Sequence, residues 1–180
     1  MSCLSQDFSE MREIPIPQSE NSSGFISRQN LASHFISQKS FNWKDTKVPT
    51  TAKIVLLDSK FEVVDYYFFK KFNNWFKELQ FENGFLPIDQ KENLDCDNFA
   101  MLYKSLMGIA SYKSKSQYEP AVAVAVVEQK NEFGGIPAGY LHMLNLVFTN
   151  NGWYIFEPQT GKFVKLEDYP NQEYIQYFIL

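Results

Sequence analysis

The sequence has few of the residues that build metal sites, disulfide frameworks or nucleic-acid surfaces. Two cysteines and two histidines occur in 180 residues, and neither a Cys-x-x-Cys nor a His-Glu-x-x-His motif is present. We therefore expect no protein-bound metal and no cofactor. The net charge is −4 with a pI near 5.2, and the basic residues form no cluster, which argues against a nucleic-acid partner. No apolar run approaches the length of a membrane span.

The first residues also lack the apolar stretch of a secretory signal. The chain starts Met-Ser-Cys-Leu and continues with polar residues, so a cytoplasmic location is the default expectation. Cys3, followed by this polar segment, also fits a mature bacterial lipoprotein whose signal has been removed. Both locations stay open at this point.

The composition is that of a globular protein with an aromatic-rich core. Hydrophobic residues make up 44% and aromatic residues 17% of the chain, which is enough for one domain without disulfide support. Seventeen Phe and ten Tyr exceed what the core can bury, so we expect some of them to line a cleft. Residues 1–24 are rich in Ser, Gln, Glu, Asn and Pro and predict a flexible polar tail. Residues 25–180 then form the single domain.

Hydrophobic periodicity predicts helices in the first half of the domain and strands in the second. A helix is expected near 29–38, and a long helix with an aromatic, core-packing face follows Asp65 and ends before Gly84. Strands are expected at 53–58, 121–127, 140–148, 153–156, 162–167 and 174–180. The strand 121–127 is apolar on both faces, so it should lie in the middle of a covered sheet. Helices followed by antiparallel strands indicate an α+β fold.

A cysteine at the start of a further helix is the candidate nucleophile. Apolar residues follow Cys96 at helical spacing as far as Met107, and Gly108 predicts the end of this helix and 111–117 a loop. Free backbone N–H groups and the positive end of the helix dipole favour a thiolate in the first turn. The carboxylates of Asp95 and Asp97 oppose it. A basic partner is needed to favour the thiolate.

His142, the only histidine outside the N-terminal third, is the candidate base. If a four-residue turn follows its strand, Phe148 opposes Trp153, and Glu157 then shares the face of His142 one diagonal step away. A two-residue turn would move Glu157 one pair further from His142. A three-residue loop would turn Glu157 to the opposite face. The sequence therefore makes the approach of the two side chains conditional on this register.

Cys96, His142 and Glu157 together form a candidate catalytic triad. His142 would take the thiol proton, Glu157 would orient the imidazole, and the amides at the helix start would hold an oxyanion. Candidate oxyanion or supporting residues are Gln90, Asp97 and Gln159. Taken singly, such a cysteine is more often a small buried hydrophobe, and a strand histidine is usually a satisfied core residue. Their joint occurrence favours the triad.

These motifs resemble the transglutaminase-like branch of the papain-like cysteine superfamily, over roughly residues 89–161. Asp95-Cys96-Asp97-Asn98-Phe99-Ala100 resembles the opening of the cysteine helix in bacterial transglutaminase-like cysteine proteinases. His142-Met143-Leu144-Asn145 resembles their histidine strand. The segment from Trp153 to Thr160 resembles their Trp-x-x-x-Asp-Pro-x-Thr motif, with Glu157 in place of the usual Asp.

The resemblance implies a papain-like or transglutaminase-like fold in which N-terminal helices, including the cysteine helix, pack on an antiparallel sheet. It implies a thiol-dependent hydrolase of peptide or protein amide bonds, or an acyl transferase, that works through a thioester. Cell-wall endopeptidases with a similar opening use a second histidine, and arylamine acetyltransferases are longer and need a nucleotide cofactor. The rival interpretation is a non-catalytic protein of the same fold that binds a peptide or glycan in an aromatic cleft.

Overall fold

A six-stranded sheet forms the centre of the protein. The structure is a computed structural model that describes residues 15–20, 23–36, 53–84 and 95–180. The sheet has the order β2-β8-β4-β5-β6-β7, and β2 and β8 are parallel while the other neighbours are antiparallel. The strands are β2 (Lys53–Val55), β4 (Val122–Gln129), β5 (Tyr140–Thr149), β6 (Gly152–Glu157), β7 (Lys162–Lys165) and β8 (Ile175–Ile179). The predicted α+β class is confirmed.

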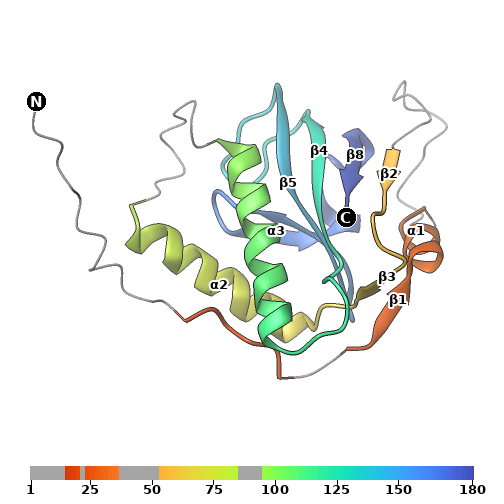
Figure 1. The fold of residues 1–180 in the computed structure, drawn as a ribbon. Helices are drawn as coiled ribbons and strands as arrows, with labels where there is room; N and C mark the ends of the chain where they lie inside the picture. Colours follow the sequence, from red (N-terminus) through yellow and green to blue (C-terminus); the bar gives the residue numbers. More distant parts are fainter. Residues whose placement is uncertain (1–14, 21–22, 37–52, 85–94) are drawn as a thin grey trace, which may run out of the picture.

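Helices cover both faces of this sheet. The described helices are α1 (Arg28–Ile36), α2 (Tyr66–Glu82) and α3 (Cys96–Lys113), with short 3-10 helices η2 (Leu166–Asp168) and η3 (Gln172–Tyr174). A separate two-stranded antiparallel sheet pairs β1 (Phe25–Ser27) with β3 (Lys60–Glu62). α2 and α3 form one buried cluster with the sheet, and α1 packs in the other cluster. Figure 1 shows α3 lying along β5 and β4.

α2 confirms the aromatic helix predicted after Asp65. The Asp65 carboxylate accepts a hydrogen bond from the Phe68 backbone N–H at 2.8 Å and so caps the first turn. The aromatic face of the helix is buried, and Phe76 packs edge-on against Tyr103 of α3 and Phe156 of β6. The predicted role of this face in core packing is therefore confirmed.

The predicted end of α3 at Gly108 is wrong. The helix continues to Lys113, so the loop predicted from residue 111 begins only after that residue. Met107, Ala110 and Ser111 extend the buried face beyond the glycine. This packing outweighs the modest helix penalty of a single glycine, about 1 kcal/mol. Ser114 ends the helix, with its N–H and its hydroxyl both bonded to the Ala110 carbonyl.

β4 lies in the middle of the sheet, as its two apolar faces predict. It pairs with β5 on one side and β8 on the other. Ala123 and Ala125 contribute to the cluster that contains α1, while Val122 contributes to the cluster of α2 and α3. A strand that is buried on both faces leaves no polar side of its own, which explains the unbroken apolar run.

The described residues 15–20 lie against the helical face of the protein. Ile16 packs on the cluster formed by α2 and α3, and the Ser19 N–H donates to the Ser114 hydroxyl at 2.8 Å. The division into a tail at 1–24 and a domain at 25–180 stays a prediction. Among the described helices, none is both long enough and apolar enough to cross a membrane.

Replacing Phe76 by Ala should lower the free energy of unfolding by about 3–5 kcal/mol, because the ring is fully buried between α3 and β6. Phe81 is a matched control, since it lies on the same helix but is 79% exposed. Its replacement by Ala should change the stability by no more than about 0.5 kcal/mol. Urea denaturation of both variants measures the difference, and similar losses would contradict the packing described for α2.

Candidate active site

Cys96 is the first residue of α3, where the sequence predicts it. Asp95 is the N-cap and forms a capping box with Asn98, whose side-chain oxygen accepts from the Asp95 backbone N–H at 3.2 Å. Cys96 is partly exposed. The thiol therefore lies beside the unpaired N–H groups of the first helical turn and within reach of solvent.

The hairpin between β5 and β6 has the register on which the sequence prediction depends. Phe148 pairs with Trp153, and Thr149 pairs with Gly152, so the predicted register is confirmed. The Thr149 hydroxyl donates to the Gly152 carbonyl at 2.9 Å, and Gly152 has a φ of +97° that favours glycine. The ladder ends at the pair Asn145 and Phe156. The next residue beyond that pair is Leu144 on β5 and Glu157 on β6.

His142 and Glu157 form a buried pair. The imidazole Nε2 lies 2.5 Å from the Glu157 Oε2 atom, and the two residues are 4% and 0% exposed. The other carboxylate oxygen, Oε1, accepts from the Gln159 backbone N–H at 3.0 Å. Both oxygens of Glu157 therefore have partners, which a buried carboxylate requires.

Cys96 is the second polar partner of the imidazole. Burial by itself lowers the pKa of His142, but hydrogen bonds to Cys96 and Glu157, together with their negative charges, raise this pKa to about 9. Because Glu157 engages Nε2, Nδ1 is the nitrogen left for the thiol. An imidazolium is thus favoured at neutral pH, as a thiolate–imidazolium pair requires.

The two aspartates beside Cys96 interact with each other. A hydrogen bond that the neutral Asp95 carboxyl donates to Asp97 raises the pKa of Asp95, and burial and the charge of Asp97 add to this effect. Asp97 itself is exposed in the first turn of α3. Since a raised pKa favours the neutral carboxyl, the pair opposes a neighbouring thiolate less than two isolated carboxylates would.

Two buried amides that the sequence reasoning missed hold the site in place. The Asn145 side chain on β5 donates to the Ala100 carbonyl of α3 at 3.0 Å and to the Ala123 carbonyl of β4 at 3.2 Å. The Gln80 side chain on α2 donates to the Pro158 carbonyl at 2.8 Å. Each amide interrupts an apolar pattern, Asn145 in a strand and Gln80 one turn after Phe76. That interruption is the signal by which they could have been found.

The predicted supporting residues have different positions. Gln159 contributes its backbone N–H to Glu157, and its buried side-chain oxygen has no partner among the described residues. Asp97 acts on the pKa of Asp95, whereas the side chains that raise the pKa of His142 are Cys96 and Glu157. Gln90 lies outside the described residues. Within those residues, no group of three or more His, Cys, Asp or Glu side chains is arranged to hold a metal ion.

Comparisons with known proteins identify the fold. No protein-family profile and no curated protein matches the sequence. A solved structure described as a PSL1a–E64 complex matches with a TM-score of 0.58 and 14% identity, over 87% of this chain and 50% of that chain. The lectin of Polyporus squamosus, bound to a human-type influenza-binding epitope, matches with a TM-score of 0.55 and 13% identity, over 87% and 49% of the two chains.

The chain therefore shares the papain-like α+β fold of these two structures, and the expected resemblance is confirmed at the level of the fold. It spans about half the length of the solved chains that it matches. The same fold is found in a protein complexed with E64, a cysteine protease inhibitor, and in a lectin. The fold by itself thus allows catalysis and does not require it.

Replacing Glu157 by Gln should lower the pKa of His142 from about 9 towards the ordinary 6.5, because a neutral amide removes both the charge and the strong acceptor. NMR titration of the imidazole measures this, with His34 as the only other histidine signal. Glu128→Gln, a change to a half-exposed side chain on the neighbouring β4, should leave the pKa of His142 unaltered. An unchanged pKa in Glu157→Gln would contradict the pairing.

The same pKa predicts how His142 affects stability as pH changes. A group whose pKa rises on folding contributes its full stabilisation below the unfolded pKa, here 6.5, and loses it as pH rises through about 9. The difference in unfolding free energy between the wild type and His142→Gln should therefore shrink from pH 6.5 to above pH 9. Urea denaturation at several pH values measures it, and a difference that grows would reverse the assigned sign.

Proposed function

We propose that this protein is a thiol-dependent hydrolase of peptide or protein amide bonds. The observation that carries the proposal is the buried 2.5 Å contact between His142 and Glu157, with Cys96 as the other partner of the imidazole at the start of α3. A nucleophile, a base and an orienting acid in this order are the parts that acyl transfer requires. The papain-like fold supports the same interpretation.

In the first half-reaction, the Cys96 thiolate attacks the amide carbonyl carbon and the carbonyl oxygen becomes negatively charged. Backbone N–H groups in the first turn of α3, where Cys96 lies, would stabilise the oxyanion. The His142 imidazolium gives its proton to the departing amine nitrogen. The carbon–nitrogen bond breaks, and the acyl group stays on the sulfur as a thioester.

In the second half-reaction, neutral His142 takes a proton from water, and the resulting hydroxide attacks the thioester. The acid product leaves, Cys96 returns to the thiolate form, and His142 is again the imidazolium. An amine in place of water would give acyl transfer through the same thioester. Hydrolysis is the simpler reaction, because it needs no site for a second substrate.

Glu157 replaces the aspartate that is usual in the family which this sequence resembles, and its surroundings compensate for the longer side chain. The Gln159 N–H holds Oε1, while Gln80 holds the intervening Pro158 carbonyl. These two hydrogen bonds fix the backbone after β6 and direct Oε2 at Nε2 of His142. We infer that Glu157 keeps the imidazole in the tautomer that presents Nδ1 to the thiol.

The second candidate function is non-catalytic binding of a peptide or glycan, which the lectin of the same fold supports. The buried charges favour catalysis over this alternative. Burying a histidine–carboxylate pair costs desolvation free energy that an apolar pair would not. A binding surface has no need for such a pair beside a cysteine, whereas a thiol nucleophile depends on it.

The rate at which iodoacetamide labels Cys96 tests the proposal. In a Cys3→Ser background at pH 6, His142→Ala should slow the labelling by about tenfold or more, because the thiolate loses its counter-ion. His34→Ala is the matched control and should label like the parent. Equal rates for the parent and His142→Ala would rule out the triad.

E64 provides a second probe, since a neighbour of this fold was solved in complex with it. Intact-mass spectrometry should detect one E64 adduct on the parent protein and none on Cys96→Ser. Labelling of His142→Ala should be slower than that of the parent. An adduct that persists in Cys96→Ser would place the reactive group elsewhere.

A further inference from the structure

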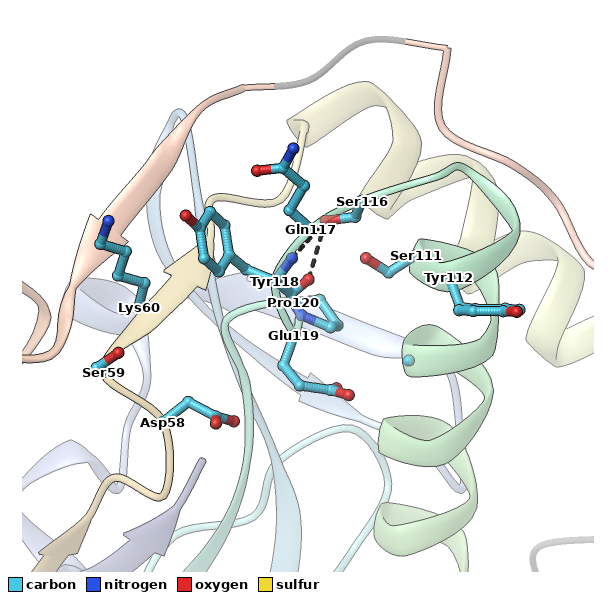
Figure 2. A pocket seen from close by; sticks show the side chains of 11 residues that line it. Asp58, Ser59, Lys60, Ser111, Tyr112, Ser116, Gln117, Tyr118, Glu119 and Pro120 are labelled. Carbon is cyan, nitrogen blue, oxygen red and sulfur yellow. Dashed lines mark hydrogen bonds between the residues drawn. The ribbon is translucent and has the colours of Figure 1, made fainter.

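A polar hollow of about 300 Å³ lies at the end of α3 that is remote from Cys96. Figure 2 shows its walls, which are the last turns of α3, the turn at residues 58–60 and the loop at residues 116–120. Tyr112 is sixteen residues after Cys96 in the same helix, so the two lie about 24 Å apart at 1.5 Å per residue. The polar hollow is therefore a different place from the candidate active site.

Hydrogen bonds to the backbone hold both loops of the polar hollow. The Ser116 hydroxyl accepts from the Tyr118 N–H at 3.2 Å and donates to the Tyr118 carbonyl at 2.9 Å. The Glu62 N–H donates to the Glu119 carbonyl at 2.8 Å, and the Arg28 guanidinium donates to the Asp58 carbonyl at 2.7 Å. Main-chain contacts thus fix the walls, and the side chains stay available for a ligand.

Three polar side chains that line the hollow make no hydrogen bond or ion pair with other described residues. They are the Asp58 and Glu119 carboxylates and the Gln117 amide, and all three residues are exposed. Together they offer several acceptor oxygens and one pair of amide donors. This combination suits a ligand that carries several hydroxyl groups.

The charges around the polar hollow balance. Burial lowers the pKa of Lys104, while the charges of Glu119 and Asp58 oppose that shift, so this ammonium lies near both carboxylates. Its Nζ atom donates to the Val122 carbonyl at 2.7 Å. Lys60 provides a second positive charge at the rim. The Arg28 guanidinium, bonded to the Asp58 carbonyl, and the Glu62 carboxylate, bonded to the Ser111 hydroxyl, add one charge of each sign. Three carboxylates and three cations favour a neutral ligand over an ion of either sign.

An aromatic ring flanks these polar groups. In Figure 2 the Tyr118 side chain stands beside the polar hollow, whereas the Tyr112 side chain points away from the other labelled residues. The Lys60 ammonium lies 5.6 Å from the centre of the Tyr118 ring and 4.8 Å from that of Phe25, which helps to hold this wall. A second hollow of about 420 Å³ adjoins beyond Gln117 and Tyr118.

We propose that the polar hollow binds a neutral oligosaccharide. The C–H face of a pyranose ring would pack on a tyrosine ring, and its hydroxyl groups would donate to Asp58 and Glu119 and exchange hydrogen bonds with Gln117. The two adjoining hollows give room for two or more sugar units. This inference concerns binding alone and does not rest on the proposed reaction at Cys96.

The test is saturation-transfer-difference NMR of the full chain with lactose, cellobiose and N,N′-diacetylchitobiose, followed by a titration of each binder. We expect at least one of them to bind with a Kd of about 1 mM. Tyr118→Ala should weaken this binding by about 2- to 10-fold, the range expected for one aromatic contact. Tyr67→Ala is the control, since Tyr67 is a tyrosine that is 76% exposed and lies outside the polar hollow.

A second variant, Asp58→Asn with Glu119→Gln, tests the polar contacts and should also weaken binding while the thermal midpoint stays close to that of the parent. Failure of all three disaccharides to bind would overturn the proposal, as would parent-like affinity in both variants. A disaccharide that slows iodoacetamide labelling of Cys96 and binds Tyr118→Ala as tightly as the parent would overturn it too. Iodoacetamide labelling of Cys96 in the absence of sugar tests the proposed reaction on its own. Failure of the sugar-binding proposal can therefore be distinguished from failure of the proposed reaction.

Discussion

The buried pair of His142 and Glu157 is the interaction on which the candidate active site depends. An imidazolium and a carboxylate at 4% and 0% exposure are stable only while each retains its partners. The rest of the site supplies them. Cys96 engages the imidazole from α3, and the Gln159 N–H engages the far carboxylate oxygen. A displaced strand or helix would leave a buried charge without a partner, so the site constrains the alignment of the whole fold.

Two buried amides provide that alignment. Asn145 ties α3 to β5 and β4 at Ala100, one helical turn after Cys96 and three residues after His142 on its own strand. Gln80 ties α2 to the backbone that directly follows Glu157. Because each amide satisfies main-chain carbonyls inside the core, a shift of helix against sheet would leave those carbonyls unpaired. The aromatic packing between α2, α3 and β6 resists the same shift.

Much of this arrangement could be predicted from local sequence signals. Asp65 marks the start of α2, Asp95 the start of α3, and the apolar run in β4 its central place in the sheet. Gly108 misled the prediction, because local propensity could not reveal that residues beyond it pack on the core. The role of Gln80 was not predicted, because its hydrogen-bond partner, Pro158, is 78 residues away in the sequence. The polar hollow was not predicted for the same reason, since its side chains come from two separate segments and α3.

The sequence by itself determined which side chains are available and the order in which they occur: a cysteine at a helix start, then a histidine and a glutamate on successive strands. It left three possible turns between those strands, and they would have put Glu157 in three different positions. Tertiary structure selected the one that pairs Phe148 with Trp153. The physical reason is that side chains alternate along a strand, so one residue of slip would exchange buried and exposed faces. Packing on both faces of the sheet excludes that slip, and the same packing brings His142 to Glu157.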